Sequence, residues 1–192
     1  MCDAYIKKKH ERFHTNNFLE WINKTYHCNY RVISEPEPPE AIIQTNSKKS
    51  WVEISTAFLN SYYAQDVTSY ATSGEKHVRA SNGLFLDPDK TAAHNFITVV
   101  KKKLEKRSYL PIAKELGPGY LIIPILNPFF DEDTLSAMKD EWNRTEIEDL
   151  GCFRSIFVSY RSTIGITVQS NWKFYRWPKK RMYQGLQLHT SR

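Results

Sequence analysis

Apolar side chains recur at helical spacing in three parts of the chain. The clearest stripe predicts a helix over 91–107, with apolar residues at intervals of four, three and four positions. They are Ala93, Ile97, Val100 and Leu104. A second helix is predicted over 7–24, and the polar stretch 15–17 is the place where it would break. A third is predicted over about 134–147, with Asp131 and Asp133 as N-cap candidates.

Shorter apolar or alternating runs between these helices predict strands. They cover 30–33, 41–45, 50–56, 120–126, 153–160, 164–168 and 172–177. Residues 60–90 are polar and weakly patterned, and we interpret them as a long excursion from the sheet. Strands that are joined through helices predict an α/β fold, a mixed sheet flanked by helices. We further expect the hairpin 41–56 to lie inside this sheet and the helix 91–107 to cover the sheet.

Composition sets broad limits on the chain. Its 192 residues, 41% hydrophobic and 25% charged, predict a single domain over 1–192 that ends in a basic tail at about 179–192. No apolar run approaches the roughly 18 residues of a membrane span, so no membrane partner is expected. The N-terminal lysines are followed by no apolar stretch, unlike a signal peptide. Three scattered cysteines fit a reducing, cytoplasmic (intracellular) location. The net charge of +6 permits a polyanionic partner without requiring one, and it leaves the oligomeric state open.

Two glutamates flank the predicted hairpin 41–56. With 46–49 as its loop, Thr45 would face Ser50, and alternation would place Glu40 and Glu53 on one face as diagonal neighbours. Their backbones would then lie roughly 7–8 Å apart. Two converging carboxylates suit a hard divalent cation, Mg²⁺ or Mn²⁺, which can activate water for attack on a phosphate. The alternative is that both glutamates lie on a solvated face.

The same segment resembles the PD-(D/E)xK nucleases, the restriction-endonuclease-like superfamily. The relevant branch carries E-x-P-D followed by an E-V-T or E-I-T strand. Glu37-Pro38-Pro39-Glu40 is similar to the first element and Glu53-Ile54-Ser55 to the second. The order of elements over about 7–126 also agrees. The resemblance implies a restriction-endonuclease-like fold, a metal held by Glu40 and Glu53, and hydrolysis of phosphodiester bonds in nucleic acid, with DNA favoured over RNA.

The chain departs from this pattern at the family's lysine. That lysine follows the second acid by two positions and positions or activates the attacking water, but Ser55 stands there. Lys103 is the candidate substitute, because the helix 91–107 carries it to the edge of the buried stripe. The alternative is a surface lysine whose stem lies along the helix. Without a replacement, the protein would be a catalytically silent nucleic-acid-binding or interaction module on the same fold.

The family often adds an acid from the first helix. We predict that Glu20 has this role, because it falls on the same side of the helix as Phe13. The alternative is a capping box, since Asn17 and Glu20 have the required spacing if the helix restarts there.

A competing motif lies near the N-terminus. His10-Glu11-Arg12-Phe13-His14 satisfies H-E-x-x-H, the zinc metalloprotease signature, in which two histidines bind zinc and the glutamate is a general base. The basic surroundings argue against a buried zinc helix, and only Glu35 or Glu37 would offer a third ligand. We expect His10 and His14 to be largely exposed and to bind no structural zinc.

A second basic feature interleaves aromatic and cationic residues over 171–181. Such a segment suits stacking on bases and contact with phosphates. The alternative, which we favour, is an edge strand whose aromatic side chains face the core and whose lysines protect the open edge.

Overall fold

The computed structural model of the protein describes residues 4–46, 48–72, 74, 76–79, 87–161 and 172–177. Its helices are α1 (Ala4–Tyr26), α2 (Ser61–Ala71), α3 (Pro88–Leu104), the 3-10 turn η1 (Arg107–Tyr109), α4 (Leu110–Leu116) and α5 (Glu132–Asn143). Its strands are β1 (Arg31–Ser34), β2 (Ala41–Thr45), β3 (Lys48–Ile54), β4 (Ala57–Phe58), β5 (Gly119–Leu126), β6 (Phe153–Arg161) and β7 (Trp172–Trp177). The predicted strand 164–168 and the basic tail 179–192 lie outside the described residues.

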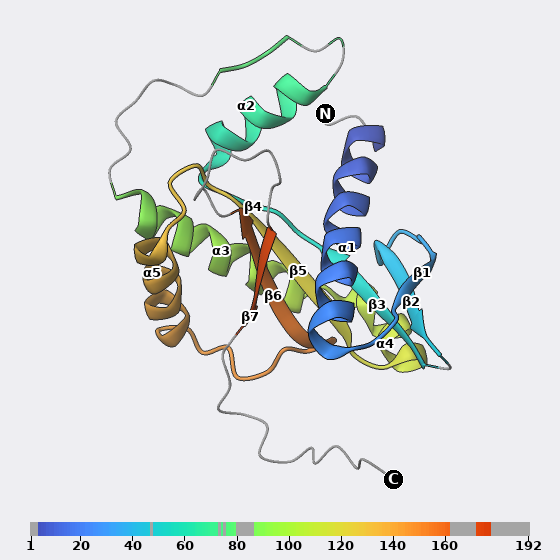
Figure 1. The fold of residues 1–192 in the computed structure, drawn as a ribbon. Helices are drawn as coiled ribbons and strands as arrows, with labels where there is room; N and C mark the ends of the chain where they lie inside the picture. Colours follow the sequence, from blue (N-terminus) through green and yellow to red (C-terminus); the bar gives the residue numbers. More distant parts are fainter. Residues whose placement is uncertain are drawn as a thin grey trace.

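The strands form a mixed sheet in the order β1-β2-β3-β5-β6-β7, and β4 also pairs with β5. The central strands β3, β5 and β6 are parallel, whereas β1, β2 and β7 are added antiparallel at the two edges. Helix α1 packs on one face, and α3 and α5 pack on the other (Figure 1). This confirms the α/β class, a mixed sheet flanked by helices.

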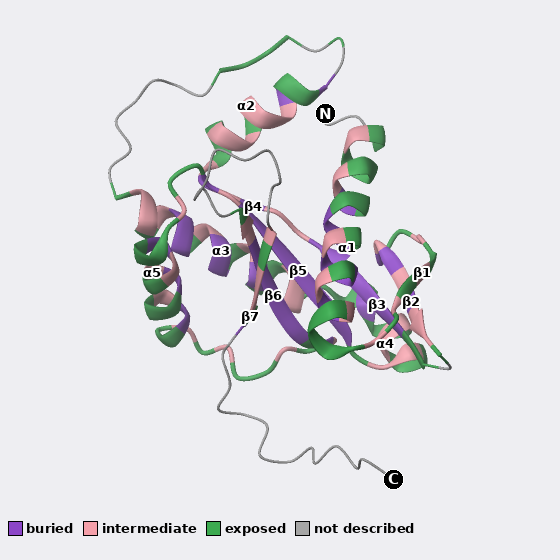
Figure 2. Cartoon of the chain, in the orientation of Figure 1, coloured by how far each residue is buried: buried purple, intermediate pink, exposed green. Residues whose placement is uncertain are grey.

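The sheet is buried on both faces. Strand β5 is buried almost throughout, and purple strands fill the centre of the molecule (Figure 2). Successive residues of β3 alternate between the two cores, since Val52 belongs to the core beneath α1 and Trp51 to the core on the opposite face, which also contains α3. On α3, Ile97 and Val100 are buried and Leu104 packs at the margin of the same core. The hairpin therefore lies inside a sheet that α3 covers, as predicted, while β3 itself packs against α4 and η1 on this face.

The hairpin register differs from the prediction by two residues. Thr45 pairs with Lys48 and Ile43 with Ser50, so the connection is shorter than the predicted loop 46–49. Asn46 adopts a positive φ of 47°, a left-handed conformation that permits the tighter turn. Because the shift is even, every side chain keeps its predicted face. The pairing of Ala41 with Val52, continued by one step, places Glu40 directly across from Glu53 rather than diagonal to it.

Helix α1 runs without the predicted break. The Asn17 side-chain amide donates to the Phe13 carbonyl, a bond made within the helix rather than at a restart. Its buried residues recur every three or four positions and form one face of the helix. That face carries Glu11, His14, Thr15, Phe18, Leu19 and Ile22.

The excursion 60–90 contains a helix that the sequence pattern did not predict, α2, with Asn60 as its N-cap. Helix α4 was not predicted either. Of the two N-cap candidates before α5, Asp131 forms the cap, in a capping box with Thr134. No helix in the described ranges combines the length and the apolar character needed to cross a bilayer.

Gly119 at the start of β5 makes a close approach on which the core depends. A Cβ atom at this position would overlap the indole ring of Trp51, which is fully buried. The same indole stacks on Tyr109, with ring centroids 5.6 Å apart, and donates from Nε1 to the Gly117 carbonyl at 2.8 Å. Trp51 is therefore held on three sides, and it cannot move away without loss of contacts.

We predict that Gly119→Ala lowers the free energy of unfolding by about 2–3 kcal/mol, measured by urea denaturation, because overpacking forces strain into the core. In a Trp51→Leu background, the added cost of Gly119→Ala should fall below about 1 kcal/mol, because the clashing ring is absent. Strictly additive losses in this double-mutant cycle would contradict the assigned contact.

Candidate functional site

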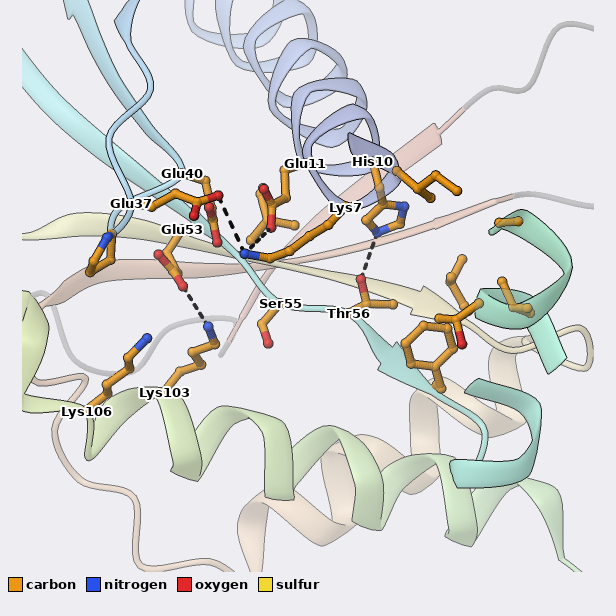
Figure 3. Close-up of a pocket in the computed structure, with 18 residues that line it drawn as sticks. Lys7, His10, Glu11, Glu37, Glu40, Glu53, Ser55, Thr56, Lys103 and Lys106 are labelled. Atoms are coloured by element: carbon orange, nitrogen blue, oxygen red, sulfur yellow. Dashed lines mark hydrogen bonds and ion pairs between the residues drawn. The ribbon is translucent and has the colours of Figure 1, made fainter. Parts of the chain in front are cut away.

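A pocket of about 610 Å³ lies where β3 gives way to β4. The two strands use the same partner in the same register, since Ile54 pairs with Ile122 and Ala57 with Ile125. Ser55 and Thr56 lie between the end of β3 and the start of β4, and both line the pocket. Helices α1 and α3 approach this interruption from opposite sides (Figure 3).

Glu53, near the end of β3, is the most deeply buried acid of the pocket, with 1% of its surface exposed. Its Oε1 atom accepts hydrogen bonds from Lys103 Nζ and from the Tyr109 hydroxyl, each at 2.6 Å. Its Oε2 atom has no hydrogen-bond partner in the described part of the chain. A buried carboxylate is costly unless it is paired, and among the described residues only one of the two oxygens of Glu53 is satisfied.

Lys103 reaches Glu53 from α3. Its side chain is 17% exposed, and the ion pair with Glu53 bridges two elements that lie 50 positions apart in the chain. The structure therefore places Lys103 inside the pocket, and the alternative of a surface lysine does not describe its position. Tyr109 Oη lies 3.3 Å from Lys103 Nζ, which completes a three-membered contact.

Three further carboxylates gather beside Glu53. Side-chain oxygens of Glu11, Glu37 and Glu40 lie within 4.8 Å of one another, a spacing that could hold a metal ion. Lys7 lies 3.3 Å from Glu11 Oε1 and 3.7 Å from Glu37 Oε1 (Figure 3). The predicted pair Glu40 and Glu53 thus lines one pocket.

The proximity of these acids changes their ionisation. Burial, together with the charges of Glu53 and Glu11, raises the pKa of Glu40 to about 7. Burial also raises the pKa of Glu11, against the opposing effect of Lys7. The pKa of the Tyr109 hydroxyl is raised by burial and by its hydrogen bond to Glu53, so this hydroxyl stays protonated and remains a donor. The pocket therefore holds more negative charge than its geometry easily accommodates.

Glu20 lies elsewhere. It is exposed and does not line the pocket. The prediction assumed that Phe13 marks the buried face of the helix, but Phe13 is 45% exposed and Phe18 is the buried aromatic residue. Glu11 lies seven positions before Phe18 on that buried face, and it is the acid of α1 that lines the pocket. The capping-box alternative fails as well, because α1 does not restart at Asn17.

We expected the histidines of the H-E-x-x-H motif to be largely exposed, and this prediction is wrong. His14 is 1% exposed, with its ring against those of His10 at 4.4 Å and Trp172 at 4.7 Å. Burial lowers the pKa of His14 to about 3, so it is neutral. His10 is partly buried and contacts the Thr56 hydroxyl through Nε2 at 2.8 Å. The misjudgement arose because the flanking lysines suggested a solvated helix, whereas β7 covers this part of α1.

Neither acid proposed as a third zinc ligand lies with both histidines. Glu35, one candidate, accepts hydrogen bonds from Arg12 at 2.6–2.9 Å. Glu37, the other candidate, lies with Glu11 and Glu40. Among the described residues, neither histidine belongs to a group of three potential metal ligands.

The described part of the basic and aromatic segment, β7, pairs with β6 at the edge of the sheet, in agreement with the edge-strand alternative. Trp177 is buried in the core, and Phe174 packs against Phe18 and Trp21 of α1. The rest of the segment, residues 171 and 178–181, lies outside the described residues.

Sequence reasoning missed Lys7, Lys106 and Tyr109 as residues of the site. Helical spacing could have found Lys7, which lies four positions before Glu11. Tyr109 has no such signal, because its place depends on how η1 packs under β3. The chain matches no family model, no curated protein and no solved structure.

The raised pKa of Glu40 predicts a pH-dependent stability. Its folded pKa of about 7 exceeds the ordinary 4.5, so the folded state binds more protons between these values and loses stability as the pH rises through them. In EDTA, Glu40→Gln should therefore stabilise the protein by about 1–2 kcal/mol at pH 8, after allowance for solvent screening.

This gain should disappear near pH 4, where Glu40 is protonated in both states. Thermal unfolding across pH 4–8 measures it, and the exposed Glu20→Gln is the matched control that should show no such trend. An equal effect of Glu40→Gln at all pH values would contradict the assigned repulsion.

Proposed function

We propose that the protein is a metal-dependent nuclease that hydrolyses phosphodiester bonds of nucleic acid, with Mg²⁺ or Mn²⁺ as the cofactor. The observation that carries the proposal is the state of Glu53. This carboxylate is buried, is held through one oxygen by Lys103 and Tyr109, and keeps its other oxygen unpaired beside a crowded acidic group. A divalent cation would satisfy that oxygen and neutralise the repulsion.

The donor set suits such an ion. The carboxylates of Glu11, Glu37 and Glu40 lie within 4.8 Å of one another, and Glu53 lines the same pocket. Carboxylates offer the hard oxygen ligands that Mg²⁺ and Mn²⁺ prefer. When bound, the ion would lower the pKa of an attacking water and stabilise charge on the phosphate. In this proposal Lys103 has the role of the motif lysine that Ser55 replaces, because its ammonium group lies at Glu53 from another element. The resemblance to the PD-(D/E)xK superfamily supports the same assignment.

A second candidate function is a catalytically silent nucleic-acid-binding module. The favouring observation is that Lys103 already neutralises one oxygen of Glu53, so the ion pair could be structural. In that case nucleic acid would bind in a salt-sensitive manner through cations such as Lys106, and neither metal would support cleavage.

We predict that Glu53→Gln abolishes Mg²⁺- or Mn²⁺-dependent cleavage, with a loss of at least about a hundredfold, because the amide removes the charge that binds the ion. Glu40→Gln should have nearly the same effect, since both acids would hold one ion. The amide at position 53 keeps an oxygen that can accept from Tyr109, so circular dichroism should report an intact fold.

The assay uses single- and double-stranded DNA and RNA with each metal, and Glu20→Gln is the control that should remain active. A Glu53→Gln variant as active as the wild type would contradict the proposed ligand. If the wild-type protein cleaves none of these substrates, the nuclease proposal is wrong and the catalytically silent binding module replaces it.

Lys103 generates a separate prediction. Lys103→Met should lower kcat by about a hundredfold or more, as expected when a positioned group that acts in the transition state is lost. Lys102→Met on the exposed side of α3 should cause only a small loss that decreases with added salt, as for a peripheral phosphate contact. Equal and salt-sensitive losses for the two variants would contradict a role for Lys103 in the reaction.

A further inference from the structure

The pocket has two chemically different ends. One end is charged, and carries the four glutamates with Lys7, Lys103 and Lys106. The other end is lined by apolar side chains that come from four elements. They are Ile6 of α1, Phe58 of β4, Val67 and Ala71 of α2, and Leu126 of β5. Hydrolysis of a phosphodiester bond uses the charged end alone, so the proposed chemistry leaves the apolar end without a role.

A polar contact separates the two ends. His10 Nε2 and the Thr56 hydroxyl lie 2.8 Å apart on the side of the pocket away from Lys106 (Figure 3). An imidazole ring and a hydroxyl group both carry atoms that form hydrogen bonds. A pair of this kind suits the polar edge of a heteroaromatic ring.

The depth of the site restricts what can reach it. Glu53 is 1% exposed, so a phosphate group approaches it only by entering the pocket. The pocket volume of about 610 Å³ lies within the range of small-molecule sites and leaves room for more than a phosphate. In a duplex the base attached to that phosphate stays stacked and paired, whereas an unpaired base can turn into the pocket.

We propose that the apolar end is a nucleobase subsite, so that the substrate is an unpaired nucleotide of a single-stranded nucleic acid whose phosphate lies at the carboxylates. The substrate class rests on the proposed nuclease function. The base subsite itself rests only on the pocket lining. In this arrangement Phe58 provides the aromatic ring for stacking, and His10 and Thr56 contact the polar edge of the base.

Binding of small ligands tests the subsite without any catalysis. Nucleoside 5′-monophosphates and ribose 5-phosphate, which lacks only the base, are titrated into Mn²⁺-supplied protein by calorimetry. At least one nucleotide should bind at least about tenfold more tightly than ribose 5-phosphate, as expected for a stacked base. Equal affinities, or no binding of any nucleotide, would overturn the proposal.

Two variants of α2 test whether the tighter binding of the nucleotide arises at the apolar end of the pocket. Val67→Trp fills the apolar end and should remove the advantage of the nucleotide while leaving ribose 5-phosphate binding unchanged. Gln65→Trp adds the same bulk at an exposed position outside the pocket lining and should keep the advantage. If Val67→Trp fails to fold, Phe58→Leu should weaken nucleotide binding about fivefold or more through loss of stacking. An unchanged preference in a folded variant would contradict the subsite.

Strand preference completes the test. Single-stranded DNA, single-stranded RNA and the matching duplexes are each used to displace the bound nucleotide from the pocket. Each single strand should displace the nucleotide at a concentration at least about tenfold lower than its duplex. Duplex that competes equally well would overturn the assignment of the substrate. The proposed nuclease function fails by a different result, the absence of metal-dependent cleavage, and the base subsite can be present in either case.

Discussion

Burial of the Glu53 carboxylate is the constraint on which the rest of the site depends. A charge in the middle of a buried sheet must be paired, and the partners come from segments distant in sequence. Lys103 at the end of α3 and Tyr109 of η1 both reach the same oxygen. This requires α3 to end near β3 and the chain to turn back at once through η1. The ring of Tyr109 then stacks on Trp51, so the partner of the acid is also part of the core.

The part of the fold that sequence could predict is the part with strong periodicity. Alternation assigned the two faces of the hairpin, and a register error of two residues left those faces unchanged. Alternation alone therefore places Glu40 and Glu53 on the same face of the hairpin. The buried stripe of α3 was readable in the same way, and it brought Lys103 to the correct side of the helix.

What sequence could not predict depends on packing between distant elements. Phe13 and Phe18 are both aromatic, but only tertiary contacts decide that Phe18 is buried and Phe13 exposed. The same packing places Glu11 rather than Glu20 in the pocket lining. His14 is buried because a strand from the other end of the chain lies against it. The sequence pattern did not predict helix α2 because this helix buries little: Ser69 is its buried residue, and its other positions are exposed or partly exposed.

The charges of the pocket argue for function rather than stability. Four glutamates and three lysines line it, and burial together with the charges of Glu53 and Glu11 raises the pKa of Glu40 to about 7. Such crowding costs stability, and buried ion pairs seldom improve on a well-packed apolar core. Perturbed carboxylates in a cleft are more typical of sites that bind a cation or a reacting group. The apolar end of the same cleft adds no charge, so the charged residues that set these pKa values all lie at the other end.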